Sequence, residues 1–233
     1  MRMLQIADLH LQHEWFSWVE SQCTEFEALC ISGDLFNAFS NTSMHDQARE
    51  ISAWLLALRY RYIVPCTGNH DWVPKDNRVS IDVNAEGGWL KNLRGRMTHG
   101  RRRILGTDGD IVTIDGLKFG INGWLQIPSY AGRLDILVTH APPSGCRCAI
   151  DSSGRDNGDP AIWDMLKYSP PRLILSGHIH DPSRHWDRWT PVSPQTLVLV
   201  PGCDETSAIP AHWIIDTVSH TATHNNGTRV RWE

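Results

Sequence analysis

The sequence predicts an α/β protein in which strands and helices alternate in the first part of the chain and strands dominate the remainder. Three observations carry this prediction: short apolar runs bounded by turn residues, helical periodicity between the first of these runs, and a hairpin pattern near the middle. The 233 residues, 26.4 kDa in mass, can bury a substantial core. We expect one domain spanning residues 1–233, with two small domains as the alternative.

Six short apolar runs have the length and composition of buried strands. Several are rich in β-branched residues, and each is bounded by turn-forming or polar residues. From the N-terminus, the predicted strands are Met3–Ala7, Ala28–Ser32, Tyr62–Cys66, Leu134–Thr139, Arg172–Ser176 and Leu197–Val200.

Helical patterns fill the intervals between the first three strands. Segments Glu14–Gln22 and His45–Tyr60 show helical character, and in the second the apolar residues between Ile51 and Leu58 share one face. Such alternation predicts βαβ units with helices packed over the sheet.

The pattern changes in the second half of the chain. Residues Ile104–Trp124 predict an antiparallel hairpin that turns at Asp115-Gly116, and Ala211–Val218 predicts a further strand, followed by a turn at Asn225–Gly227. The loop Ala141–Pro160 is rich in Pro, Gly, Ser and Asp, and its length favours a loop that faces substrate over a domain boundary.

Composition and charge narrow the classes of function. The net charge of -4 and pI near 6.3 provide no basic field for binding nucleic acid without sequence preference. No apolar stretch approaches the roughly 20 residues that span a bilayer. The first apolar run lacks a cleavage site and is interpreted as a strand, which predicts a cytoplasmic protein that does not associate with membranes.

The six cysteines follow no disulfide framework, and we expect them to be reduced. Cys146 and Cys148 form a C-x-C pair in the predicted loop, which leaves a zinc or redox element open. Loop cysteines without a chemical role are favoured, because no second pair stands at zinc-site spacing.

Residues able to bind metals follow the predicted strands repeatedly. In open α/β sheets the carboxyl ends of the strands form the ligand-binding edge, so these segments are expected to converge there. Each pattern alone also has a structural explanation, since Gly-Asp often forms a turn and a single histidine often accepts or donates one hydrogen bond in a loop. Those explanations do not account for the order of the five segments along the chain or for their shared position after predicted strands. The segments are Asp8-Leu9-His10, Gly33-Asp34, Gly68-Asn69-His70-Asp71, Thr139-His140 and Gly177-His178-Ile179-His180.

The residue types suit a centre of two metal ions. Ions about 3.5–4 Å apart need a bridging ligand, and the carboxylate of Asp34 can offer one oxygen to each. Imidazole and oxygen donors without thiolates favour Mn, Fe, Zn or Co. Asp8 and His10 can both reach a metal only if the chain has already left strand geometry.

The order D-x-H, G-D, G-N-H-D, H, G-H-x-H, from Asp8 to His180, resembles the calcineurin-like metallophosphoesterase family. The resemblance implies a four-layer α/β/β/α sandwich of two mixed sheets flanked by helices. It also implies two divalent or trivalent transition-metal ions, with Mn favoured and Fe, Zn, Co or Ni as alternatives. By resemblance, one ion is held by Asp8, His10 and His180, the other by Asn69, His140 and His178, and Asp34 bridges the two.

The resemblance also assigns the residues that carry the reaction. It makes His70 the catalytic histidine that assists the leaving group, with Asp71 orienting its ring, while a hydroxide bridging the metals attacks phosphorus in line. The family often has a second Asp three residues after the G-D aspartate, where this chain has Asn37. That departure leaves the contacts at this edge of the site open.

The implied reaction is hydrolysis of a phosphomonoester or phosphodiester in a small substrate, a nucleotide being one option. A nuclease acting on DNA or RNA is the first alternative, disfavoured by the net charge, and a non-catalytic metal-binding scaffold is the weaker one. The sequence leaves the oligomeric state open.

Three further features have both a functional and a structural interpretation. Trp72 and Trp124 could stack on an aromatic group of the substrate, although packing is favoured in a chain with 11 tryptophans. Arg101–Arg103 could steer a phosphorylated substrate, although a solvated turn is favoured.

Overall fold

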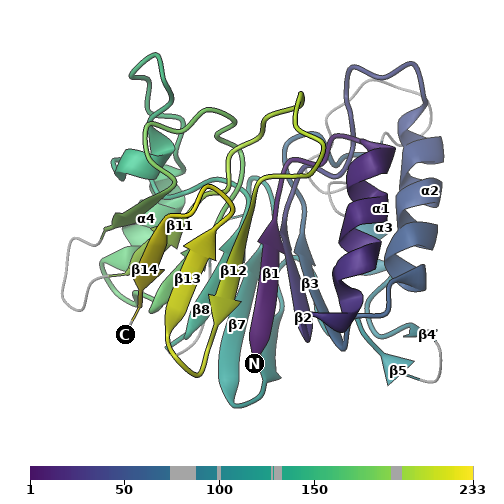
Figure 1. The fold of residues 1–233 in the computed structure, drawn as a ribbon, viewed down its shortest axis with the longest axis horizontal. Coiled ribbons are helices and arrows are strands. Elements are labelled where there is room, and N and C mark those ends of the chain that lie inside the picture. The colour runs from purple at the N-terminus through teal and green to yellow at the C-terminus, as the bar shows by residue number, and fades with distance from the viewer. Residues whose placement is uncertain (74–87, 99–100, 127, 129–132, 190–195, 233) are drawn as a thin grey trace.

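A computed structural model describes residues 1–73, 88–98, 101–126, 128, 133–189 and 196–232, and within them the chain forms two six-stranded sheets (Figure 1). The first sheet has the order β14-β13-β12-β1-β2-β3, and the second β10-β11-β9-β8-β7-β6. Both sheets mix parallel and antiparallel pairs.

The strands of the first sheet are β1 (Arg2–Ile6), β2 (Ala28–Ser32), β3 (Tyr62–Cys66), β12 (His212–Asp216), β13 (Thr221–His224) and β14 (Arg229–Arg231). Those of the second are β6 (Ile111–Ile114), β7 (Leu117–Asn122), β8 (Ile136–Thr139), β9 (Leu173–Leu175), β10 (Trp186–Arg188) and β11 (Leu197–Leu199). A short ribbon pairs β4 (Met97–Thr98) with β5 (Arg101–Arg102).

Helices α1 (His13–Ser21) and α2 (Met44–Ala57) connect the parallel strands β1, β2 and β3, as the predicted βαβ units require. These helices lie on one side of the molecule and α4 (Pro160–Leu166) on the other (Figure 1). The remaining helical segments are η1 (Gln22–Thr24), α3 (Gly88–Lys91) and η2 (Arg147–Ala149).

Three apolar clusters separate the layers. Successive residues of β1 alternate between them, since Leu4 packs with the α1 and α2 side chains whereas Met3 packs between the two sheets. On the far side of the second sheet, Ile174 packs against Ile162 and Leu166 of α4. The layers therefore run helix, sheet, sheet, helix, which confirms the predicted α/β/β/α sandwich.

Most strands lie where the sequence predicts them, whereas two helices differ. Helix α2 ends at Ala57, before the predicted Tyr60, because Leu58 adopts a ψ of 142° and the buried Tyr60 hydroxyl donates to the Val19 carbonyl at 2.7 Å. Helix α4 was not predicted. It begins at the end of the segment assigned to a loop, where the Asp159 carboxylate accepts from the backbone N–H of Ala161.

All six cysteines are free, as expected. Cys146 and Cys148 lie fully buried beneath the second sheet with their Sγ atoms 3.2 Å apart, and burial raises the pKa of the Cys148 thiol well above its usual value. Their position in the apolar core supports the packing interpretation over a metal or redox role.

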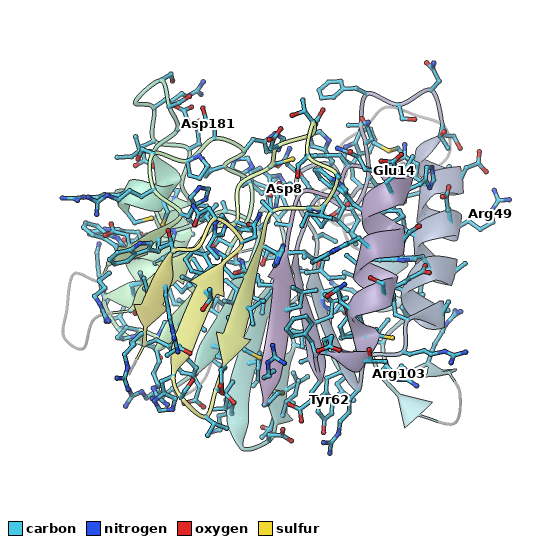
Figure 2. All side chains as sticks on the ribbon, viewed as in Figure 1. Asp8, Glu14, Arg49, Tyr62, Arg103 and Asp181 are labelled. Carbon is cyan, nitrogen blue, oxygen red and sulfur yellow. The ribbon has the colours of Figure 1, made fainter. Side chains whose placement is uncertain are left out.

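Arg103 donates to the backbone carbonyls of Arg59 and Tyr60, at the end of the molecule opposite Asp8 (Figure 2). It ties two chain segments together, which contradicts a role in steering substrate to the candidate metal ligands. The side chains of Arg101 and Arg102 lie outside the described residues. No helix in the described part of the chain combines the length and the apolar character needed to cross a bilayer.

Candidate metal centre

The predicted metal ligands meet at one edge of the molecule, where the parallel strands of both sheets end. Asp8 lies at the upper end of β1 in Figure 2, and Asp181, next to a predicted ligand, lies at the same end, whereas Tyr62 at the start of β3 lies at the lower end. The centre therefore lies where the loops of the two sheets face each other, as expected for carboxyl ends of parallel strands.

Four predicted ligands have the left-handed backbone conformation that non-glycine residues rarely adopt. The φ angles are 55° for Asp8, 44° for His10, 55° for Asp34 and 69° for His178. Such conformations cost about 1–3 kcal/mol each and persist where surrounding contacts impose them. Here the N–H groups of Asp8 and His10 donate to the carbonyls of Gly33 and Asp34 at 3.0 and 3.1 Å. The chain has left strand geometry, as chelation by Asp8 and His10 requires.

Glycines allow the loops of the two sheets to approach closely. A Cβ atom on Gly33, whose φ is +85°, would lie 2.5 Å from Nδ1 of His140. A Cβ atom on Gly177 would lie 2.8 Å from a carboxylate oxygen of Asp8. Any larger residue at either position would push a predicted ligand away from the centre.

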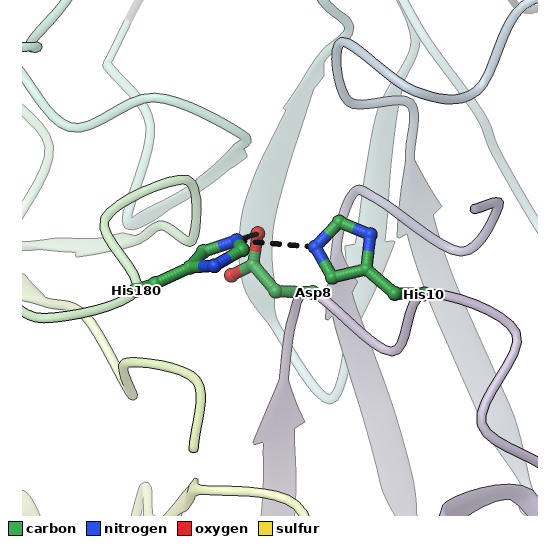
Figure 3. Close-up of side chains that lie close together, drawn as sticks. All are labelled: Asp8, His10 and His180. Atoms are coloured by element: carbon green, nitrogen blue, oxygen red, sulfur yellow. Dashed lines mark hydrogen bonds and ion pairs between the residues drawn. The ribbon is translucent and has the colours of Figure 1, made fainter. Parts of the chain in front are cut away.

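The first group of donors consists of Asp8, His10 and His180 (Figure 3). The Nε2 atoms of the two histidines lie 3.1 Å apart, and Nε2 of His180 lies 3.7 Å from Oδ1 of Asp8. Nδ1 of His10 donates to the carbonyl of Phe36 at 3.2 Å, so Nε2 of the neutral ring presents a lone pair to the centre. Burial lowers the pKa of both histidines, which favours the neutral form that metals bind.

The second group is arranged around the side-chain oxygen of Asn69. That oxygen lies 2.9 Å from Nε2 of His140 and 2.9 Å from Nδ1 of His178. The other ring nitrogen of His140 donates to the carbonyl of Ser32 at 2.8 Å, which directs Nε2 to the centre. Burial lowers the pKa of His178 to about 3, so its ring is neutral.

Asp34 lies between the two groups and belongs to both. Its Oδ2 lies 3.4 Å from Nε2 of His140, and its Oδ1 accepts from the backbone N–H of His70 at 2.8 Å. Donor atoms of Asp34 lie within 4.8 Å of those of Asp8 and His140, and also within 4.8 Å of those of His10 and His70. This shared position is the one that a bridging carboxylate needs.

Electrostatics at the centre favour a bound cation. Burial raises the pKa of the Asp8 carboxyl to about 8. Burial would likewise raise the pKa of Asp34, but the positive charge of His140 and the hydrogen bond between them hold it below its usual range. Burial lowers the pKa of His140, yet the charge of Asp34 outweighs this effect and raises it to about 9. Metal binding would displace that proton and offset the buried carboxylates.

The distances between donors also fit metal coordination. Metal–nitrogen and metal–oxygen bonds of roughly 2.0–2.2 Å place neighbouring donors of one ion roughly 2.8–3.6 Å apart in octahedral or tetrahedral geometry. The observed separations of 2.9, 3.1, 3.4 and 3.7 Å lie close to this range. The side chains are therefore arranged to hold cations with little movement.

His70 differs from the predicted ligands in the hydrogen bond that it accepts. Its Nδ1 accepts from the backbone N–H of Ala38 at 3.3 Å, so a neutral ring carries its hydrogen on Nε2. Its ring centroid lies 4.7 Å from that of His10. A histidine in this tautomer can donate a hydrogen bond, whereas a metal ligand would need a lone pair on Nε2.

The Asp71 carboxylate contacts backbone N–H groups, and its predicted role in orienting the His70 ring stays a prediction. One carboxylate oxygen accepts from the N–H groups of Leu35 and Phe36 at 2.8 and 2.9 Å, and the other accepts from Gly68 at 2.8 Å. The His70 ring accepts a hydrogen bond from the N–H of Ala38. Asp71 therefore ties the loop after β2 to the loop after β3, and it positions the backbone that carries Asp34 and Asn69.

Asn37, which departs from the family pattern, also shapes a loop. Its side-chain oxygen accepts from the N–H of Phe39 at 2.9 Å, and its backbone N–H and carbonyl pair with the side chain of the buried Gln47 at 2.8 and 3.0 Å. These contacts belong to the loop that leads into α2 rather than to the metal ligands.

Several residues beside the centre were not identified from the sequence. The carbonyls of Ser32 and Phe36, which orient ligand histidines, leave no signature in residue type. Phe39, 89% exposed, lies 5.5 Å from the His70 ring. Cys203 donates from Sγ to the carbonyl of Asp8 at 3.5 Å, and an isolated cysteine provides no signal that could have revealed it.

Comparison with known proteins gives the same family as the motifs. A model described as calcineurin-like phosphoesterase matches residues 1–182. A search of curated proteins found no match.

Solved structures share the fold at low sequence identity. The TT1561 protein of Thermus thermophilus is 11% identical with a TM-score of 0.58, covering 96% of this chain and 97% of its own. A further crystal structure is 12% identical with a TM-score of 0.65, and the match covers 100% of this chain and 99% of the other. A metallophosphoesterase from Sphaerobacter thermophilus is 15% identical with a TM-score of 0.47, and the match covers 100% of this chain and 90% of the other. At these identities, the likeness to the first two structures extends to the fold alone.

Proposed function

The chain belongs to the calcineurin-like phosphoesterase family, and from this membership we propose that it hydrolyses phosphate esters at a centre of two transition-metal ions. The observation that carries the proposal is the position of Asp34, whose carboxylate lies close to Asp8 and His10 of the first group and also to His140 of the second. A single ion would not need a carboxylate in both groups.

We assign one ion to Asp8, His10 and His180, the other to Asn69, His140 and His178, and the bridge to Asp34. When bound, the two ions would supply an activated water and neutralise the phosphoryl oxygens. Mn is the favoured metal, with Fe, Zn, Co or Ni as alternatives, because the donors are nitrogen and oxygen.

The protein's own contribution begins with His70. With Nδ1 held by Ala38, its Nε2–H can donate to the oxygen of the departing group, which otherwise leaves as an unstable alkoxide. Asp71 acts as a positioning residue, because its three backbone contacts fix the loops that present Asp34 and Asn69. Exposed Phe39 adjoins His70 on the same side.

We propose a small phosphomonoester or phosphodiester as the substrate and the cytoplasm as the location, consistent with six free cysteines.

We also propose that the chain works as a single domain. The apolar cluster between the sheets contains residues as distant in sequence as Met3 and Trp232, so the two sheets bury a common core.

The test combines metal stoichiometry with a substrate panel. Protein stripped with a chelator is titrated with Mn²⁺ by calorimetry, and the loaded protein is assayed on para-nitrophenyl phosphate, bis-para-nitrophenyl phosphate, mononucleotides and short oligonucleotides. We expect two Mn²⁺ per chain and metal-dependent release from a small ester. Two bound ions without hydrolysis of any ester would support the scaffold alternative, and cleavage restricted to oligonucleotides would support the nuclease.

A further inference from the structure

An apolar hollow of about 300 Å³ lies beside the metal centre, on the side of the second sheet. Its apolar walls come from Trp124, Leu125, Ala141, Pro160 and Ala161. These residues belong to the segment after β7, the segment after β8 and the start of α4. Three separate parts of the chain therefore enclose one apolar space.

Trp124 connects this hollow directly to the proposed metal ligands. Its ring centroid lies 5.1 Å from that of His178 and 5.7 Å from that of His140. A group bound against Trp124 therefore lies next to the ligands of the second ion. This proximity suits a substituent attached to the phosphorus of a substrate better than an independent ligand.

The backbone that carries Trp124 is fixed by hydrogen bonds to a neighbouring loop. Its backbone N–H donates to the carbonyl of Thr67 at 3.1 Å. Thr67 is held in turn by the buried Asp108, whose carboxylate accepts from the Thr67 N–H at 2.9 Å and from its hydroxyl at 2.7 Å. Because this backbone is fixed before a ligand arrives, its ordering adds no further entropic cost to binding.

Leu125 adds an apolar surface that folding alone does not explain. Its side chain is 59% exposed, and its φ is 56°, a conformation that a leucine rarely adopts. Both features cost free energy in the free protein, and strain of this kind is concentrated at binding sites. A ligand that covers Leu125 would recover part of that cost through apolar burial.

Two polar side chains of the hollow already have hydrogen-bond partners within the protein. The Asp159 carboxylate accepts from the N–H of Ala161 at 2.7 Å, and the side-chain nitrogen of Asn157 donates to Asp151 at 2.8 Å. A larger hollow of about 500 Å³ lies beside His180, but its lining is more polar because it includes the carboxylates of Asp181 and Asp204. The smaller hollow is therefore the one suited to an apolar ring.

We propose that this hollow binds a planar aromatic ring carried by the substrate, either an aryl group or a nucleobase; the inference rests on the proposed phosphoesterase function and specifies its substrate class. A cavity of roughly 150 Å³ is sufficient for benzene, so the volume admits one ring or two fused rings. Stacking on Trp124 adds to the burial of the ring.

The test uses pairs of non-reacting ligands that differ only in the ring, measured by calorimetry on Mn-loaded protein. Phenylphosphonate is compared with methylphosphonate. The methylene phosphonate analogue of adenosine monophosphate, which has no ester bond to hydrolyse, is compared with the same analogue of ribose phosphate. We expect about tenfold tighter binding of the aromatic member in at least one pair, as stacking on an aromatic side chain provides. Preference in the first pair identifies an aryl group, and preference in the second alone identifies a nucleobase. Equal affinities in both pairs would overturn the proposal.

Two variants test whether the preference arises in the hollow. Trp124→Ala removes the stacking wall, and Ala161→Trp fills the space without touching a ligand histidine; both should abolish the preference. Ala53→Trp, at an exposed position on α2, is the matched control and should retain it. A preference that survives Ala161→Trp contradicts the proposal even if Trp124→Ala disturbs the metals.

The two proposals can fail separately. A ring preference without hydrolysis of any ester would leave the hollow assigned and overturn the proposed function. Hydrolysis with no ring preference would support the proposed function and overturn the assignment of the hollow.

Discussion

Two clusters of histidines lie in the described part of the chain, and one of them has the geometry of a metal site. The first surrounds Asp34, and the second consists of His185, which precedes β10, and His212 and His224 of β12 and β13. Burial lowers histidine pKa values in both, to about 4 for His224. Among the described residues, the groups with metal-binding geometry draw from the first cluster and include none of the three histidines of the second.

One difference lies in how the two ring nitrogens of His224 are used. Nε2 of His224 donates to the carbonyl of Pro201 at 2.9 Å, and its Nδ1 accepts from the N–H of Asn226 at 3.3 Å. In the first cluster, His10 and His140 each give one nitrogen to a carbonyl and keep the other for the centre. Proximity of imidazoles is therefore insufficient for a metal site, which also needs unused nitrogens and buried carboxylates.

The largest effect is expected from Asp34→Asn, which keeps the shape of the side chain but removes the negative charge of the bridge. We expect metal content to fall below one ion per chain and turnover of para-nitrophenyl phosphate to fall by about 10³-fold or more. Elemental analysis and steady-state kinetics measure both. Asp164→Asn on α4, with a side chain 66% exposed, is the matched control. Full metal content and full turnover in the Asp34 variant would contradict the bridging role.

His70→Gln should separate proton donation from metal binding within the same cluster. Because Nε2–H is the proposed donor, we expect two ions to remain bound while kcat falls by about 10²–10⁴-fold. The loss should be smaller for para-nitrophenyl phosphate than for phenyl phosphate, since the better leaving group needs less protonation. His13→Gln, at an exposed histidine of α1, provides the control. Loss of one metal ion would instead make His70 a ligand.

Asp71→Asn should weaken the centre indirectly. The amide has one acceptor oxygen for the three backbone N–H groups that now donate to the carboxylate, so at least one of them loses its partner. We expect metal affinity to fall by about 10–100-fold, as for other residues that orient ligands, together with a lower Tm. Calorimetric Mn²⁺ titration and thermal unfolding measure these changes. Unchanged affinity with reduced kcat would mean that Asp71 acts on His70.

These contacts show which parts of the molecule could be predicted from sequence. The strand ends and the ligand segments that follow them were predictable because apolar runs and motifs are local in the chain, and β2 and β3 have the predicted bounds. The hydrogen-bond partners of Asp71 could not be predicted. They are backbone N–H groups, which every residue except proline has, so the partner positions carry no characteristic residue type. Helix α4 was missed because only one turn of apolar residues, Ile162 to Leu166, follows its cap.

The hollow beside Trp124 depends on tertiary structure in the same way. Trp124 was identified as one of two tryptophans that could stack on a substrate, but the sequence contained no sign that Ala141 and Ala161 lie opposite it. Trp72, which had equal standing in the sequence, is half-buried like Trp124 but does not line this hollow. Contacts between loops of different strands, rather than residue type, distinguish the two.

The smallest effect is expected in the second histidine cluster. The neutral His224 has a folded pKa of about 4, whereas an unfolded histidine titrates near 6.5. Between these values the unfolded chain binds more protons, so the free energy of unfolding should fall as pH decreases from about 6.5 to about 4, by about 2 kcal/mol after allowance for partial solvent screening. His224→Asn should reduce this slope and leave metal content unchanged. Urea unfolding across this range measures it, with exposed His13→Asn as the control. The metal-site histidines are present in every variant, so the difference in the slope of unfolding free energy against pH isolates His224. Equal slopes in the His224 variant and the unaltered protein would mean that burial does not hold this ring neutral.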